Sequence, residues 1–163
     1  DCRAVYVQLG AGQINDITSE VRMTVDALLK HEDLHVILGE SMIGTRIEID
    51  LPNVHIIRDY PNSQYFKGFD SVVQAGGYNS FHETRAFGLP ALFYPNMETG
   101  MDDQLGRCKI AEEEGWGIVL ESRSASNVEK SCTQLLELIG KEENLQIENG
   151  ATDIARILLE EIE

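Results

Sequence analysis

Short apolar segments that alternate with helical patterns constrain the fold of this chain more than any other feature. Apolar, β-branched runs bounded by turn residues occur at Ala4–Val7, Leu34–Leu38, Val54–Ile57, Ser71–Val73, Ala91–Tyr94 and Gly117–Leu120. Strands that alternate with helices form a parallel sheet that is covered on both faces. We therefore expect an α/β fold, a Rossmann-like open parallel sheet of about six strands with helices on both faces.

The helical patterns lie mostly between these runs and continue after the last one. They are Thr18–Lys30, Tyr78–Phe87, Asp103–Glu114, Ala125–Ile139 and Ala151–Ile162. A polar, acidic connector, Gly140–Gly150, separates the last two. The chain has 163 residues and 42% hydrophobic content, which suits one ordinary domain with a proper core. We expect residues 1–163 to form that single domain.

Charge and cysteine content exclude several classes of protein. A formal net charge of -15 opposes binding of DNA or RNA along an extended surface, because the phosphate backbone would be repelled. A single small nucleotide is still possible, since a helix N-terminus can hold it locally. The three cysteines, Cys2, Cys108 and Cys132, lack any C-x-x-C spacing, so we expect neither a disulfide framework nor a metal site. A reducing cytoplasm fits this pattern best.

The loop after the first expected strand carries part of a dinucleotide-binding pattern. Gly10-Ala11-Gly12 supplies two glycines of G-x-G-x-x-G, and Asn15 replaces the third. No acidic residue ends the second strand at the expected offset of ~20 residues. Asp16 or Thr18 would cap the helix that follows. A tight turn and a ligand contact explain this loop equally well, and both interpretations stay open.

The loop after the fourth expected strand is better suited to hold phosphate. Gly76 and Gly77 let the backbone approach a ligand closely, and Asn79 and Ser80 lie in or beside the first turn of a helix. Free N–H groups and the positive helix end would face a diphosphate there. Glu83 lies one turn further, where its carboxylate could accept hydrogen bonds from two ribose hydroxyls. It could equally be the capping-box partner of Asn79 or Ser80.

The stretch that contains this second loop resembles a known family. It carries, in order, Asp70, Ser71-Val72-Val73, Gly76-Gly77, Ser80, Glu83, Gly88-Leu89-Pro90, Pro95 and Asp103-Gln104. The order and spacing are similar to the C-terminal half of inverting GT-B glycosyltransferases, the group that contains MurG and the UDP-glycosyltransferases. Weaker likeness extends from the first strand to Trp116-Gly117. The resemblance implies that the chain is the nucleotide-sugar-binding half of such a protein.

The resemblance also implies roles for individual residues. Glu83 would bind the ribose hydroxyls, Gly77–Ser80 would surround the diphosphate, and Asp103-Gln104 would hold hydroxyls of the transferred sugar. The segment Ile57–Tyr60 matches the place where family members read the base through backbone groups, which favours uracil. Gly10–Asn15 would face the cleft near the phosphates and the acceptor. The implied donor-binding residues are Gly76, Gly77, Tyr78, Asn79, Ser80, Glu83, Asp103, Gln104, Ile57, Arg58, Gly10 and Gly12.

Two positions depart from the family pattern. Ala75 stands where family members carry His or Arg, so backbone N–H groups would have to replace a side-chain contact to the diphosphate. Arg107 replaces the Asn that usually follows the D-Q pair by three. The identity of the sugar donor is therefore open.

The resemblance implies a metal-independent, inverting transfer of a hexose or N-acetylhexosamine from a UDP-sugar to an acceptor hydroxyl. The UDP-sugar is a substrate, and no cofactor is implied. Family members take the catalytic base from an acceptor-binding N-terminal half, which is absent from this chain. We therefore expect no catalytic residue here and no transfer by the isolated domain. The missing half, or a partner subunit, could bring an acceptor associated with a membrane.

Other functions remain open. The chain opens almost directly on a strand, which suits a fragment of a longer protein or a stand-alone donor-binding subunit of a two-component transferase. A UDP-sugar hydrolase or epimerase could use the same fold. An NAD-dependent oxidoreductase would rest on Gly10-Ala11-Gly12 alone.

Overall fold

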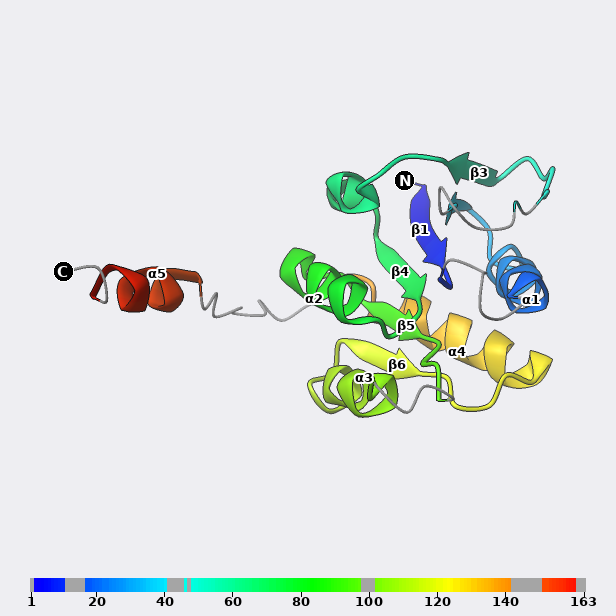
Figure 1. The fold of residues 1–163 in the computed structure, drawn as a ribbon. Helices are drawn as coiled ribbons and strands as arrows, with labels where there is room; N and C mark the ends of the chain where they lie inside the picture. The colour runs from blue at the N-terminus through cyan, green and yellow to red at the C-terminus, as the bar shows by residue number, and fades with distance from the viewer. Residues whose placement is uncertain are drawn as a thin grey trace.

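Six parallel strands form the central sheet of the molecule (Figure 1). The computed structural model describes residues 2–10, 17–40, 46, 48–97, 102–141 and 151–160. The strands are β1 (Arg3–Gln8), β2 (Leu34–Gly39), β3 (Val54–Ile57), β4 (Ser71–Gln74), β5 (Ala91–Phe93) and β6 (Gly117–Val119). Their order across the sheet is β3-β2-β1-β4-β5-β6, and each neighbouring pair is parallel. The expected Rossmann-like α/β sheet is confirmed.

The helices follow the sequence prediction to within a few residues. They are α1 (Thr18–Leu28), α2 (Tyr78–Phe87), α3 (Gln104–Glu113), α4 (Ala125–Leu138) and α5 (Ala151–Glu160), with a 3-10 helix, η1 (Asn62–Gly68), after β3. The sequence patterns did not predict η1. The N-cap residue of α1 is Ile17, so Thr18 begins the helix and does not cap it, while Asp16 lies outside the described residues.

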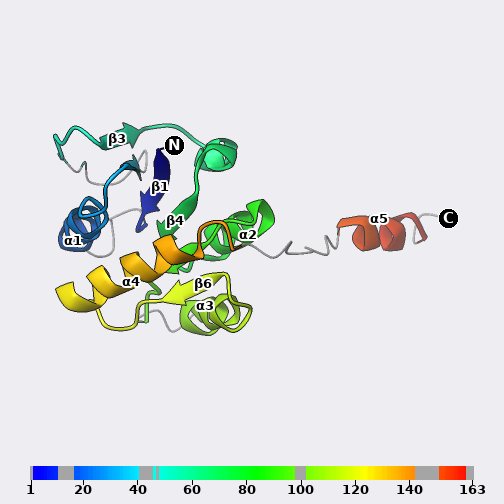
Figure 2. The same cartoon turned by 180° about the vertical axis from the view of Figure 1, so that it is seen from behind.

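Two apolar layers cover the sheet, as the expected helices on both faces require. Successive strand residues point to opposite faces, so Val5 and Val7 of β1 pack with α1 and α4. Tyr6, between them, packs with η1, α2 and α3 on the other face. The helix α4 lies behind the strands in Figure 1 and in front of them in Figure 2. Buried residues of β1, β2, β4 and β5 therefore contribute to a core on one face or the other, and half-buried residues of β3 and β6 pack against it.

The strand order reverses between β1 and β4, which places two loops side by side. Gln8 at the end of β1 is paired with Gln74 at the end of β4. The chain continues from these residues into Gly10 on one side and into the Gly76-Gly77 turn on the other. In open parallel sheets, ligands bind beyond the carboxyl ends of the strands at such a reversal. The topology therefore indicates that a ligand would bind at these two loops.

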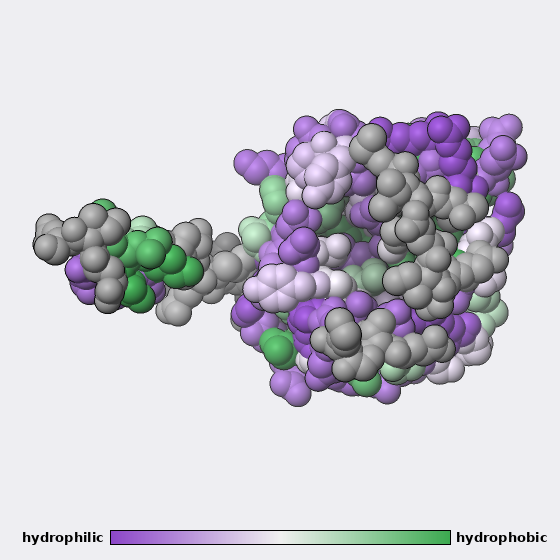
Figure 3. Space-filling model, in the orientation of Figure 1, coloured by the Kyte–Doolittle hydropathy of each residue, from purple (hydrophilic) through white to green (hydrophobic). Residues whose placement is uncertain are grey.

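The helix α5 lies apart from the sheet in both ribbon views (Figures 1 and 2). Its apolar residues Ile154, Ile157, Leu158 and Leu159 are each more than half exposed and form a patch on one side (Figure 3). Within the described residues, no helix has both the length and the apolar character needed to cross a membrane.

Candidate functional site

The glycine turn after β4 presents an open helix N-terminus. Gly77 is the N-cap residue of α2, and the first helical hydrogen bond runs from Phe81 N–H to the Gly77 carbonyl at 2.9 Å. The N–H groups of Tyr78, Asn79 and Ser80 precede that bond, and no N-cap side chain bonds to them. A Cβ atom built on Gly77 would meet nothing within 4 Å. The turn thus has room for a ligand against its backbone.

The structure excludes one of the two roles expected for Glu83 within α2. A capping box would place Asn79 or Ser80 at the N-cap position, but both lie inside the helix behind Gly77. The capping-box interpretation is therefore wrong. The Glu83 carboxylate is exposed and accepts a hydrogen bond of 3.2 Å from Ser63 Oγ in η1. It stands between the first turns of α2 and the segment that follows β3.

The buried side chain of Gln74 supports the glycine turn and the start of α2, a role that the sequence patterns did not predict. Its side chain is 2% exposed, and Nε2 donates to the Ser80 carbonyl at 2.9 Å and to Thr84 Oγ1. Its own carbonyl accepts from Tyr94 N–H at 2.9 Å. A buried amide therefore joins β4 to the first turns of α2. One sequence signal could have identified Gln74: it is a polar residue at the end of an otherwise apolar strand.

The start of α3 packs directly against Gly76. A Cβ atom at this position would overlap Cys108 Sγ and would lie 3.2 Å from the Gln104 carbonyl oxygen. The absence of a side chain at Gly76 therefore lets α3 approach the turn. On the same side, Arg107 donates to the Gly76 carbonyl at 2.6 Å, and its guanidinium carbon lies 5.4 Å from the centre of the Tyr78 ring.

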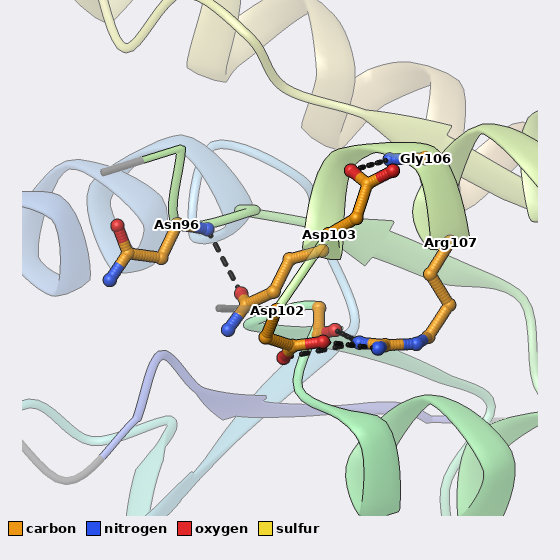
Figure 4. Close-up of polar contacts among 7 residues, drawn as sticks. Asn96, Asp102, Asp103, Gly106 and Arg107 are labelled. Carbon is orange, nitrogen blue, oxygen red and sulfur yellow. Dashed lines mark hydrogen bonds and ion pairs between the residues drawn. The ribbon is translucent and has the colours of Figure 1, made fainter. Parts of the chain in front are cut away.

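Arg107 also forms an ion pair with Asp102, just before α3 (Figure 4). The hydrogen bond from Arg107 holds the pKa of the Asp102 carboxyl below its usual range, and the Gln104 side chain contributes in the same direction. The hydrogen bond to Asp102 likewise raises the pKa of the Arg107 guanidinium. Both groups therefore stay charged at neutral pH. In the sequence, Arg107 stands out only as a departure from the family pattern.

Asp103 and Gln104 occupy the N-terminus of α3 beside this ion pair. The Asp103 carboxylate caps the helix by accepting from Gly106 N–H at 2.8 Å, and its side chain is exposed. Gln104 Oε1 accepts from Asn96 N–H at 2.9 Å, which ties α3 to the loop after β5 (Figure 4). The structure therefore brings the D-Q pair and the glycine turn together.

The other expected site residues lie further along the same sheet edge or outside the described residues. The Ile57 carbonyl accepts from Glu40 N–H at 3.0 Å, and the exposed Arg58 side chain pairs with the Glu40 carboxylate at 2.6 Å. Arg58 thus binds the end of β2, and within the described residues no hydrogen bond or ion pair joins it to the glycine turn. Gly10 is exposed with φ of +112°, a left-handed region that favours glycine. Gly12 lies outside the described residues.

Among the described residues of this edge, no cluster would suit a metal ion. In the part of the chain that the structure describes, no three histidine, cysteine, aspartate or glutamate side chains gather closely enough to hold one. The groups at the site are N–H donors, carboxylates, amides and one paired guanidinium. Such groups suit a polar ligand that carries both an anionic part and hydroxyls.

Comparison with known proteins relates the chain to glycosyltransferases. No protein-family model matches it. A protein of Methanosarcina acetivorans described as an uncharacterized glycosyltransferase is 30% identical over 141 residues, which cover 78% of this chain and 35% of that protein. The chain therefore spans about a third of the length of this curated relative.

Solved structures of glycosyltransferases share the fold at low sequence identity. MurG of Acinetobacter baumannii matches with a TM-score of 0.71 and 13% identity, over 99% of this chain and 50% of that one. The spinosyn rhamnosyltransferase SpnG, in complex with thymidine diphosphate, matches with a TM-score of 0.67 and 19% identity, over 83% of this chain and 37% of that one. This chain is thus related to the GT-B glycosyltransferases and has the fold of one of their Rossmann-like halves.

Proposed function

We propose that this chain binds a nucleotide-sugar, most simply a UDP-sugar, as the C-terminal half of a metal-independent inverting glycosyltransferase. The observation that carries this proposal is the open N-terminus of α2, on a two-glycine turn at the reversal of strand order. Exposed Glu83 on the same helix supplies an acceptor for ribose hydroxyls. Asp103 and Gln104 stand across the turn, where they would hold the sugar.

The proposed reaction transfers a hexose or N-acetylhexosamine to an acceptor hydroxyl. The hydroxyl oxygen attacks the anomeric carbon, the bond from that carbon to the diphosphate oxygen breaks, and the diphosphate leaves with the electron pair. N–H groups at the start of α2 and the helix dipole would stabilise the charge that grows on the leaving group. A base in the other half of the protein would take the hydroxyl proton. The isolated chain would therefore bind the sugar donor without transferring sugar.

Several findings support this proposal. The chain spans 37% of the length of SpnG and 50% of the length of MurG, which suits a missing acceptor-binding half or partner subunit. The thymidine diphosphate bound by SpnG belongs to the same chemical class as UDP. Cys108 and Cys132 are free and buried, which agrees with a cytoplasmic location.

A ligand panel followed by thermal unfolding tests the proposal. UDP and UDP-sugars should raise the midpoint, because a ligand at 100 times its Kd stabilises the folded state by about 2.7 kcal/mol. TDP, GDP, CDP and NAD serve as comparisons. GDP and CDP change the base and keep the 2′-hydroxyl, whereas TDP lacks the 2′-hydroxyl and carries a methyl group on the uracil ring. Glu83→Ala should remove most of the UDP shift without lowering the midpoint of the free chain. An unchanged shift in this variant would refute the site assignment.

The alternative functions predict different experimental results. Preference for NAD over UDP in competition would favour an oxidoreductase. Free sugar or an epimer, formed by the complete protein without any acceptor, would favour a hydrolase or epimerase. A reading frame that continues upstream of Asp1 by a comparable domain would identify a fragment, and its absence would favour a separate donor-binding subunit. Sugar transfer by this chain alone would contradict the expectation that the base lies elsewhere.

A further inference from the structure

A chain of hydrogen bonds links the glycine turn to the residues expected to hold the sugar. The Gly76 carbonyl accepts from Arg107, and Arg107 pairs with Asp102 (Figure 4). Gln104 N–H donates to the Asp102 carbonyl at 2.9 Å, and Gln104 Oε1 accepts from Asn96 N–H at 2.9 Å. One arginine thereby connects the loop after β4 with the loop after β5.

Arg107 is held tightly enough for this connection to fix geometry. Only 17% of its side chain is exposed, and the Tyr78 ring lies against the guanidinium. Nη1 binds the Gly76 carbonyl, while Nη2 binds the Asp102 carboxylate. A planar guanidinium that uses two nitrogens in two directions leaves each neighbour little freedom.

The hydrogen bond to Gly76 has a direct effect on the backbone that would meet a diphosphate. In a trans peptide the carbonyl of one residue and the N–H of the next point in opposite directions within one plane. Because Arg107 fixes the Gly76 carbonyl, it also fixes the direction of the Gly77 N–H. The next N–H groups, at Tyr78 and Asn79, follow from the same turn.

We propose that Arg107 is a positioning residue of the sugar-donor site. It holds the glycine turn and, through Asp102, the Gln104 amide in one arrangement, so that the diphosphate and the sugar of one ligand are bound together. This inference rests on the proposed function, which it deepens. It also explains how the chain can lack a side-chain contact at Ala75 and still keep an ordered phosphate-binding turn.

The alternative is that Arg107 acts only by its charge, and Asp102→Asn distinguishes the two. Removing a carboxylate near an anionic ligand should strengthen binding if charge alone matters. If Asp102 helps to hold Arg107 and Gln104 in place, the same substitution should weaken binding. The two explanations therefore predict changes of opposite sign.

The test measures binding of uridine, UDP and a UDP-sugar to the 163-residue chain by calorimetry and NMR titration, at about 0.15 M salt. The variants are Arg107→Gln, Arg107→Lys and Asp102→Asn. Arg85→Gln is the matched control, since Arg85 also pairs with a carboxylate, Glu114 at 2.8 Å, at the C-terminal ends of α2 and α3. Thermal midpoints identify any variant that does not fold.

We expect Arg107→Gln to weaken UDP binding about tenfold and UDP-sugar binding more than that, with less than about a twofold effect on uridine. Asp102→Asn should weaken UDP-sugar binding in the same direction, Arg107→Lys should recover only part of the loss, and Arg85→Gln should behave as the unsubstituted chain. Stronger UDP binding by Asp102→Asn, or full recovery by Arg107→Lys, would overturn the positioning role.

Amide chemical shifts of the ligand-free chain separate this inference from the proposed function. Arg107→Gln should move the shifts of Gly77 and Tyr78, because their peptide groups lose their orientation, and Arg85→Gln should not. Unchanged shifts would refute the positioning role even if UDP binds. If the unsubstituted chain binds no nucleotide, the proposed function fails, and the inference fails with it as a statement about sugar-donor binding.

Discussion

The close approach of α3 to Gly76 can be tested by a double-mutant cycle with Cys108. In Gly76→Ala the new methyl group would overlap Cys108 Sγ and would lie 3.2 and 3.3 Å from the carbonyl oxygen and Cβ of Gln104. The sulfur is fully buried, so it cannot move aside into solvent. Overpacking of this kind destabilises a protein by about 1–3 kcal/mol.

The second substitution removes the atom that the methyl group would meet. Cys108→Ala alone should cost about 1 kcal/mol, because it leaves a small cavity in a buried cluster. In the double variant the methyl of Ala at 76 occupies part of the space of the sulfur. The double variant should therefore be less destabilised than the sum of the two single variants, by about 1 kcal/mol. The contacts to Gln104 remain, so the rescue should be incomplete.

Urea unfolding, followed by circular dichroism and by fluorescence of the single tryptophan, Trp116, measures the four free energies of unfolding. Gly77→Ala is the matched control, because a Cβ atom there meets nothing within 4 Å and the residue has φ of -61°. It should cost less than about 1 kcal/mol and show no coupling to Cys108→Ala. Additive effects of Gly76→Ala and Cys108→Ala would show that this contact does not limit the approach of α3.

Three further predictions follow from buried or charged groups. Tyr6→Phe should destabilise the chain by about 1–3 kcal/mol in urea unfolding, because the Tyr6 hydroxyl accepts from Asn62 Nδ2 at 2.8 Å and donates to Gln8 Oε1 at 2.8 Å; a neutral effect would contradict this. Alkylation at pH 8 should label Cys2 rapidly and the other two cysteines only after unfolding, since burial raises the pKa of both to about 12; fast labelling of all three would argue against the packing. The stabilising effect of Asp102, measured as the difference in Tm from Asp102→Asn, should be constant above about pH 5 and lost as the pH falls through its lowered pKa; loss near neutral pH would contradict the ion pair.

Most of the fold was accessible from sequence because each strand and helix has a local signal. The apolar runs and the helical spacing gave the strands and α1 to α5 to within a few residues, and Gly88 ends α2 in the left-handed conformation expected of a helix-terminating glycine. The segment η1 lacks such a signal, since its buried residues, Asn62 and Phe66, do not form a repeating pattern. Its position depends on packing against Tyr6 and α2.

The candidate site was only partly predictable, and the missed residues share a physical reason. The family pattern led to Gly77, Glu83 and the D-Q pair because these lie on one continuous stretch of chain. Gln74 and Arg107 act through contacts that local patterns do not encode, since Arg107 binds a carbonyl 31 residues earlier in the chain. Arg107 replaces the Asn that the family pattern predicts. The sequence does not indicate where the side chain of this arginine points.

Local pairing of charges explains how a chain with a net charge of -15 can still be proposed to bind an anion. Among the described residues, Arg58 after β3, Arg107 at the start of α3 and Arg123 after β6 are each paired with a carboxylate: Arg58 with Glu40, Arg107 with Asp102, and Arg123 with Glu20. Of these pairs, Arg107 with Asp102 cancels charge directly beside the glycine turn. Salt screens acidic side chains that lie more than about 10 Å from the turn. Binding would then depend on oriented N–H groups at the start of α2, whose strength comes from geometry more than from net charge.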